Sequence, residues 1–203
     1  MAKKQAKHAQ GSEERIKEAA RKVFTRKGYA ATRTRDIAEE AGINLALLNY
    51  YFRSKEKLFQ VIMFEKVEQI FGILRPVIND PTTTLMQKVE LLATHYIDLM
   101  LENPDLPFFV LYEMKNNPTQ FSSHVGGDSF VRKSELFRQF KEVRPGEDPI
   151  PYLINLFSLI IFPFVAQPLE QHFFGMGDRA YRQSMEDRKK QIPRWIKILW
   201  EQG

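Results

Sequence analysis

Apolar residues in the first part of the chain recur with the spacing of one face of a helix. Over residues 12–27 these positions are Ile16, Ala19, Ala20, Val23 and Phe24. Side chains three and four residues apart share one helical face, so this spacing predicts an amphipathic helix. Gly28 follows the stretch and is predicted to stop the helix.

A shorter helix that ends in a sharp turn is predicted next. Thr34 is a residue type that caps the start of a helix. Ile37, Ala38 and Ala41 then share one helical face. Gly42 permits the tight turn that ends this helix.

A second short helix is predicted over residues 44–52, with Asn44 as its cap. Leu48 and Phe52 lie four residues apart and form its buried face, while Tyr51 is expected to face partly inward. The residues left facing outward are Leu45, Ala46, Leu47, Asn49 and Tyr50. Two short helices at a tight angle are typical of a DNA-reading module, because the major groove admits the second helix.

Six further stretches predict helices in the rest of the chain, and Ser54 caps the first of them. Their expected ranges are 55–78, 85–101, 105–116, 130–143, 150–174 and 178–200. Residues 117–128 are predicted to form a loop, because they are rich in Pro, Ser and Gly. The sequence shows no strand-like alternation and no internal repeat, and it therefore predicts an all-α fold of about nine helices.

Charge is distributed unevenly along the chain. Residues 1–66 hold 15 Lys and Arg against 8 Asp and Glu, whereas residues 67–203 hold 15 against 17. A basic part that coincides with the turn between helices is typical of a phosphate-binding domain joined to a neutral domain. We therefore expect a disordered basic arm over residues 1–11, a helix-turn-helix DNA-binding domain over 12–57 and a second helical domain over 58–203.

Composition excludes several classes of function. The 203 residues contain no cysteine, which excludes disulfides and thiolate metal sites. The histidines lack metal-site spacing and no catalytic motif or phosphate loop is present, so no catalytic residue, metal or cofactor is predicted. The apolar run from Ile150 to Phe164 is shorter than the roughly 20 residues that a membrane span requires. We therefore expect a cytoplasmic protein without membrane contact.

Several short motifs together resemble one known family. The first helix ends in KGY, and the motifs AT, RDIAEEAGI and YYFRSKEKLF follow. This part of the chain, residues 12–62, is similar to the TetR family of bacterial transcriptional regulators. The resemblance implies an all-helical homodimer in which each helix-turn-helix reads one half of a palindromic operator in double-stranded DNA. It also implies a second domain that binds a small effector and forms the dimer interface.

The resemblance implies positions for the DNA contacts as well. Thr34 and Lys55 correspond to phosphate-binding positions, and residues 44–50 to the recognition helix. The full expected set is Arg33, Thr34, Arg35, Asn44, Leu45, Ala46, Leu47, Asn49, Tyr50, Tyr51 and Lys55. Where the family often has Tyr this chain has Asn49, whose amide can pair bidentately with adenine. Leu45 and Leu47 offer apolar contacts, for example to thymine methyl groups.

Aromatic and apolar residues of the second domain are expected to converge on a ligand cavity between helices. The expected ligand-binding residues are Phe71, Leu74, His95, Tyr96, Met100, Phe108, Tyr112, Phe137 and Phe157, with Asp98 and Glu113 as further polar candidates. This lining suits a small hydrophobic effector. The alternative for each position is a plain core residue, because aromatic stripes at helical spacing usually fill a core.

The stretch 150–174 is apolar over much of its helical circumference, which is too much for one neighbour in a small domain. Pairing with the last helix in a twofold, four-helix interface would bury this surface. The expected interface residues are Leu153, Phe157, Ile160, Ile161, Phe164, Ile192, Trp195, Ile196 and Leu199. The alternative is a central helix in the core of a monomer.

These patterns favour a sequence-specific repressor that a small effector releases from its operator. The alternative from another class is a helical protein–protein interaction module without DNA specificity. The salt dependence of DNA binding separates the two, because phosphate contacts release counterions and protein contacts do not.

Overall fold

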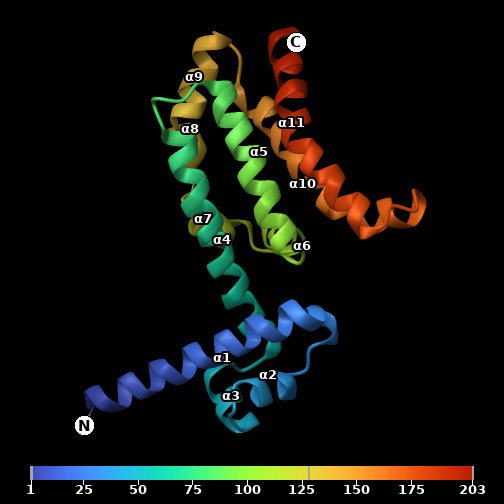
Figure 1. The fold of residues 1–203 in the computed structure, drawn as a ribbon. Coiled ribbons are helices and arrows are strands. Elements are labelled where there is room, and N and C mark those ends of the chain that lie inside the picture. The colour runs from blue at the N-terminus through green and yellow to red at the C-terminus, as the bar shows by residue number, and fades with distance from the viewer. Residues whose placement is uncertain (1, 128, 203) are drawn as a thin grey trace. The chain divides into compact units, whose positions relative to one another are not determined.

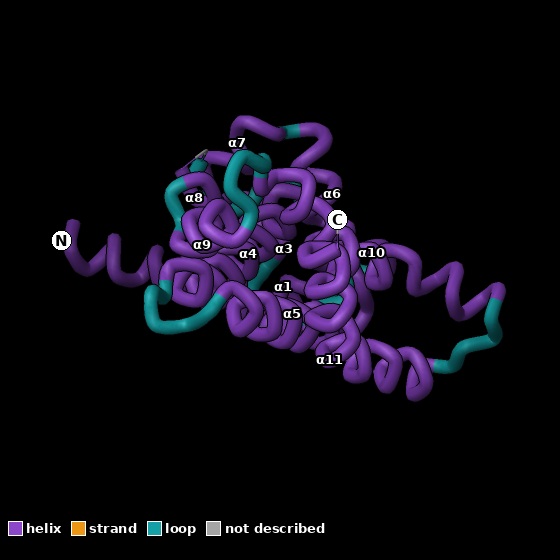
Figure 2. The backbone as a smooth tube through the Cα atoms, turned by 90° about the horizontal axis from the view of Figure 1, so that it is seen from above, coloured by secondary structure: helices purple, strands orange, loops and turns teal. Residues whose placement is uncertain are grey.

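In the computed structural model, which describes residues 2–127 and 129–202, all regular elements of the described residues are helices (Figures 1 and 2). This confirms the predicted all-α class. In chain order the helices are α1 (Ala2–Ala31), α2 (Thr34–Glu40), α3 (Leu45–Tyr51), α4 (Lys55–Asn79), α5 (Leu85–Glu102), α6 (Leu106–Asn116), α7 (Pro118–Val125), α8 (Ser129–Arg132), α9 (Glu135–Val143), α10 (Pro149–Phe173) and α11 (Asp178–Gln202). The chain divides into two compact units, one up to Lys66 and one from Val67. The division lies inside α4, whereas the sequence placed it near the start of that helix.

The first unit consists of α1, α2, α3 and the first part of α4. Its core is built from the apolar stripes seen in the sequence, and its fully buried members are Ile16, Ala20, Val23, Ile37, Leu48, Leu58 and Ile62. Gly28 interrupts α1 with a φ of +72°, a left-handed conformation that glycine adopts without steric cost. Gly42 has a φ of +62° between α2 and α3, as the predicted sharp turn requires.

The ends of the short helices are fixed by side chains. Asn44 caps α3 as predicted, because its Oδ1 accepts a hydrogen bond from the backbone N–H of Leu47 at 2.8 Å. The start of α2 differs from the prediction, since Thr34 is the first helical residue and Arg33 is the cap. Here the Asp36 carboxylate accepts a hydrogen bond from the Arg33 backbone N–H at 2.9 Å. The start of α2 is therefore fixed by the side chain of its third residue, and the predicted cap at Thr34 is wrong.

The predicted disordered arm is a further difference. Helix α1 begins at Ala2, so the described residues of the segment 1–11 are helical in the structure. The segment AKKQAKHAQ consists mainly of Ala, Lys and Gln, which are good helix formers, and it contains no proline. The helix propensity of these residues thus favours extension of α1. The prediction of a disordered arm rested instead on their basic charge and on the lack of apolar residues.

The second unit is a helical bundle around α5, which packs against α11, α10 and α9. The core side chains of α5 are Val89, Leu92, Ala93, Tyr96, Ile97 and Met100. Thr84 caps this helix through its hydroxyl, which accepts from the Gln87 backbone N–H at 3.3 Å. Both views show the end of α10 and the start of α11 extending beyond the other helices of this unit (Figures 1 and 2). Leu169, Phe173 and Phe174 are exposed there.

Two segments beyond the nine predicted helices come from the stretch between α6 and α10. The predicted loop 117–128 is wrong, because residues 118–125 form α7. Pro118 is the first residue of that helix, a position where the missing N–H costs nothing and the fixed φ is favourable. The predicted helix 130–143 is divided into α8 and α9, since the Ser134 hydroxyl caps a new helix by accepting from the Phe137 N–H at 3.2 Å.

Helix α10 is longer than the apolar run that the sequence suggested. It has 25 residues, and an 18-residue window within it has a mean hydropathy of 1.9, so the helix is long and apolar enough to span a membrane by length and composition alone. The length of α10 is therefore compatible with a membrane span, and the burial of its side chains is the remaining criterion. Leu153, Leu156, Ile160 and Phe164 are buried inside the unit, and 39% of the apolar window is buried in all. Pro163 and Pro168 lie within the helix, and each removes one backbone hydrogen bond.

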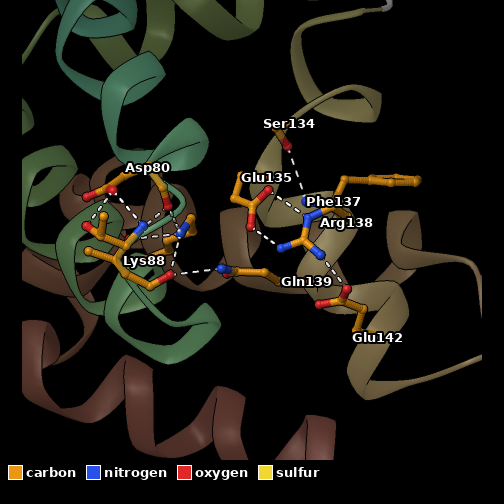
Figure 3. Close-up of polar contacts among 10 residues, drawn as sticks. Asp80, Lys88, Ser134, Glu135, Phe137, Arg138, Gln139 and Glu142 are labelled. Atoms are coloured by element: carbon orange, nitrogen blue, oxygen red, sulfur yellow. Dashed lines mark hydrogen bonds and ion pairs between the residues drawn. The ribbon is translucent and has the colours of Figure 1, made fainter.

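A fully buried lysine ties the connection between α4 and α5 together. The side chain of Lys88 is 0% exposed, and its Nζ donates hydrogen bonds to the Asp80 carbonyl and to both the carbonyl and the hydroxyl of Thr83. Figure 3 shows that Gln139 of α9 reaches the same turn, where its Nε2 donates to the Thr83 carbonyl at 2.9 Å. The turn is thus held by one charged and one neutral donor from two different helices.

Proline also lies inside α4, at position 76. Without an N–H, Pro76 cannot donate to the carbonyl four residues earlier, which belongs to Gly72. The backbone hydrogen-bond ladder of α4 is therefore interrupted in the part of the helix that belongs to the second unit.

Candidate nucleic-acid interface and apolar cavity

The outward face of α3 is available to a partner. Tyr50 is 79% exposed, Asn49 and Ala46 are exposed, and Leu45 and Leu47 are half-buried. Leu48 and the following Phe52 are buried and hold the helix on the core of the first unit. The structure thus places the five expected recognition residues away from the core. The rings of Tyr50 and Tyr51 meet edge to face with centroids 5.3 Å apart, and Tyr51 is half-buried as expected.

The first unit also carries exposed basic side chains. Arg33 and Arg35 at the start of α2 are exposed, and Thr34 between them is half-buried. Among the described residues, the exposed cations of this unit without an ion pair are Arg15, Lys22, Arg33, Arg35, Arg53 and Lys57. These side chains are the ones free to neutralise phosphate groups.

Lys55 is engaged inside the unit instead. Its Nζ donates hydrogen bonds to the backbone carbonyls of Tyr29 and Thr32, each at 2.9 Å. The same ammonium lies 4.2 Å from the centroid of the Tyr29 ring in a cation–π contact. Two of its three N–H donors are thus used to tie the start of α4 to the end of α1. Lys55 therefore has a structural role in this conformation, and its phosphate contact stays a prediction.

A group of ion pairs joins α1 to α4 within the first unit. The Glu65 carboxylate accepts from Lys17 Nζ at 2.9 Å and from Arg21 on the next turn of α1. Partial burial acts to raise the pKa of Glu65, but the hydrogen bonds and charges of the two cations outweigh it, so this pKa lies below its ordinary value. Glu65 therefore favours folding only while it is ionised.

Glu65→Gln is expected to weaken the acid dependence of the first unit's stability. A carboxyl with a lowered folded pKa stabilises the fold above its unfolded pKa, near 4.5, and loses this contribution as the pH falls through the folded pKa. At pH 7 the substitution should cost about 1 kcal/mol, because the pairs are partly exposed. Thermal unfolding at pH 7 and pH 3 measures both effects. Equal pH dependence in Glu65→Gln and in the exposed control Glu39→Gln would contradict this role.

The second unit contains an apolar cavity of about 610 Å³. Four expected ligand residues line it: Phe71, Leu74, Tyr96 and Phe157. Lining residues that the sequence analysis missed include Val67 and Ile70 of α4, Phe121 and Val125 of α7, and Phe130 and Val131 of α8. The four-residue spacing of Phe121 and Val125 was an available helical signal, which the loop-forming composition around it outweighed.

Five expected ligand residues do not line the cavity. Met100 and Phe137 are buried in the core, and Phe108 and Tyr112 are exposed on α6. His95 lies on α5 one residue before Tyr96 and so faces a different direction. The two further polar candidates have partners elsewhere: Asp98 pairs with Lys189, and buried Glu113 accepts a hydrogen bond from Asn117 at 2.9 Å. The periodicity predicted the correct helices but not which apolar face meets the cavity.

Several expected dimer residues are buried within the single chain. These are Leu153, Ile160, Phe164, Ile192 and Ile196, each at most 4% exposed, so their side chains are not available to a second copy in this conformation. Phe157 and Ile161 line the cavity. Trp195 and Leu199 are exposed on α11, where the exposed Ile198 joins them. Exposed apolar surface on these two helices therefore comprises Trp195, Ile198 and Leu199 of α11, Ile154, Phe162, Leu169 and Phe173 of α10, and Phe174 at the end of α10.

Comparison with known proteins places this geometry among DNA-binding regulators. Residues 16–62 match the family model described as bacterial regulatory proteins, tetR family. The chain is 30% identical over 135 residues to the HTH-type transcriptional regulator SAR0097 of Staphylococcus aureus, covering 64% of this chain and 69% of that protein. It is 24% identical over 141 residues to the negative regulator of the icaADBC biofilm operon, IcaR, of Staphylococcus aureus, covering 66% of this chain and 74% of that protein.

The fold is also similar to solved structures. A tetR-family regulator from Mesorhizobium loti superimposes with a TM-score of 0.65 at 20% identity, covering 94% of this chain and 97% of that one. At this identity the likeness concerns the fold, and it extends over both units.

Proposed function

Because the chain belongs to the TetR family of bacterial regulatory proteins and is a DNA-binding transcriptional regulator, we propose that it acts as a homodimeric repressor in the cytoplasm. Each copy places α3 in the major groove of one half of a palindromic operator. A small apolar effector that binds in the cavity of the second unit releases the protein from this operator. The observation that carries the proposal is the outward face of α3, with Tyr50 79% exposed, on a unit that is rich in unpaired cations.

The DNA contacts of this proposal follow from exposure and charge. Ala46, Asn49 and Tyr50 meet base edges or the sugar–phosphate backbone, with Leu45 and Leu47 at the margin of the contact. Arg33 and Arg35 bind phosphates beside the recognition helix, and Arg53 and Lys57 extend the basic surface. Two copies reach successive major grooves when their recognition helices are about 34 Å apart.

A second copy of the chain supplies the partner for the exposed apolar surface. Trp195, Ile198 and Leu199 of α11 and Phe173 and Phe174 at the end of α10 are exposed in the single chain. An apolar surface of this kind on a soluble protein marks an interface. A twofold arrangement of α10 and α11 from both copies buries it. Size-exclusion chromatography with light scattering tests this part, since a monomer at micromolar concentration would contradict it.

The cavity supports the effector part of the proposal. Its volume of about 610 Å³ lies in the usual range of small-molecule sites. Helix α4 contributes Val67, Ile70, Phe71 and Leu74 to the lining, and its first turns belong to the DNA-binding unit. An effector releases DNA to the extent that it binds the released conformation more tightly than the DNA-bound one.

Asn49→Ala is expected to relax base preference without a general loss of DNA binding. The exposed Asn49 amide has the donor and acceptor pair that recognises adenine in the major groove. Its removal should lower discrimination at one position of each half-site by about 1–3 kcal/mol. Affinity for a set of single-base operator variants measures this. Uniform weakening across all variants would show that Asn49 does not read a base.

Selection of duplexes from a random library by the purified protein tests the proposed function. An enriched palindrome with half-sites one helical turn apart, or a multiple of this, would support the homodimeric repressor. Weak binding without enrichment would contradict it and favour the protein–protein interaction module. Repression is tested separately with a reporter that carries the selected operator, where activation would contradict the negative sign of regulation.

A further inference from the structure

The wall of the cavity restricts the chemistry of its ligand. Among the described lining residues none is charged, and the only polar side chains are those of Tyr96 and Ser158. Burial raises the pKa of the Tyr96 phenol, so this group stays neutral at physiological pH. A charged group inside such a wall would lose its hydration without gaining a partner. The part of the ligand that occupies the cavity is therefore uncharged and largely apolar.

One cation lies at the edge of this wall. The guanidinium carbon of Arg75 is 5.7 Å from the centroid of the Phe130 ring, and that ring belongs to the lining. The Phe130 ring is held in turn by Phe71, edge to face, with centroids 5.0 Å apart. On α4 the neighbours Leu74 and Ile78, one residue before and three residues after Arg75, also line the cavity. Arg75 is thus an exposed cation in contact with a ring of the wall.

The turn at the end of α7 lies close to this arginine. A Cβ atom at Gly126 would lie 3.5 Å from Arg75 Nη2 and 3.5 Å from Phe130 Cβ, and the φ of Gly126 is +106°. The guanidinium therefore packs beside the turn after α7 as well as beside the ring. Contact with an aromatic ring and with a turn restricts the orientation of a side chain that would otherwise be mobile.

The charge of Arg75 has no carboxylate partner among the described residues. The side chain is exposed, so its charge is hydrated and costs little to maintain. A guanidinium that packs against a ring still presents its N–H groups within its own plane. That planar edge matches the two oxygens of a carboxylate.

We propose that the cavity binds an amphiphile with an unbranched apolar chain in the pocket and a carboxylate head on Arg75. The chemical class is a medium-chain fatty carboxylate. The inference rests on the proposed function only in taking this ligand to be the effector, because binding itself involves no DNA. Each methylene that enters the pocket tightens binding by a factor of about 4, until the chain fills the available volume.

Isothermal titration of the DNA-free protein with decanoate and with decanol tests the proposal. The two probes share a chain length and differ in the head group. Decanoate should bind about tenfold more tightly than decanol, because the head makes a charge-assisted hydrogen bond. Arg75→Gln should remove that advantage and leave decanol binding unchanged. Arg75→Lys should keep part of it, since it retains the charge without the planar fork.

A matched control is Arg182→Gln, which changes an exposed arginine of α11 outside the cavity. It should bind decanoate like the unaltered protein. Equal affinities for decanoate and decanol, an equal loss in Arg182→Gln, or no binding of either probe would overturn the proposal. If decanoate binds through Arg75 and does not weaken operator binding, the ligand assignment stands and the effector role fails. Circular dichroism of each variant shows whether the fold is retained.

Discussion

Raising the salt concentration from about 50 to about 200 mM is expected to weaken operator binding by a factor of about a thousand or more. Six cations of the first unit are exposed without an ion pair among the described residues, and a dimer presents this set twice. If half of these cations meet phosphates, about six counterions are released on binding, which sets the steep slope. The measurement is a fluorescence-anisotropy titration of the operator at several salt concentrations.

The variant Arg35→Gln tests how much one cation contributes to this salt dependence. The side chain is exposed at the start of α2, and its loss should reduce the magnitude of the slope by about 2, one phosphate contact in each copy of a dimer. Base discrimination should not change, because phosphate contacts carry no direct sequence information. Arg182→Gln serves as the control, and its slope should equal that of the unaltered protein. A slope near zero in the unaltered protein would mean that phosphates are not the partner.

Lys88→Met is expected to destabilise the second unit by about 3 kcal/mol. Methionine fills nearly the same volume, so the cost comes from the Asp80 and Thr83 carbonyls, which lose a charged donor in a buried turn. Each carbonyl left without a partner costs about 1–3 kcal/mol, and Gln139 still serves the one on Thr83. For a protein of this size the melting temperature should fall by about 10 °C.

Calorimetry of Lys88→Met and of the exposed control Lys190→Met measures the difference. The control should lie within about 0.5 kcal/mol of the unaltered protein, because surface substitutions away from special contacts have small effects. If Lys88→Met were as stable as the control, the buried ammonium would be replaceable by an apolar side chain. In that case the turn between α4 and α5 would not depend on its donors.

The helices that the sequence predicted correctly share two signals. In α3 and α5, a capping side chain and a period of three to four apolar residues agree with each other, and both are local. The prediction of secondary structure failed where loop-forming composition and helical spacing pointed to different structures. Pro118 was taken as part of a loop although proline favours the first turn of a helix, and α7 was missed with it.

The candidate sites were predictable only in part. The outward face of α3 follows from one buried pair, Leu48 and Phe52, because a short helix on one core has little choice of orientation. The inward turn of Lys55 depends on the positions of the Tyr29 and Thr32 carbonyls, which no spacing in the sequence reveals. The cavity similarly depends on α7 and α8 closing over α4, so its lining could not be assigned from helical periodicity.

The backbone hydrogen bond that is missing between Gly72 and Pro76 makes α4 easier to bend at this point. An uninterrupted helix resists bending, because every turn stretches hydrogen bonds on its outer side. In α4 one of these bonds is absent at the level of Phe71 and Leu74, which line the cavity. Deformation on filling of the cavity should therefore concentrate there and cost little energy. A ligand that fills the cavity is therefore expected to bend α4 at Pro76 and not elsewhere along the helix.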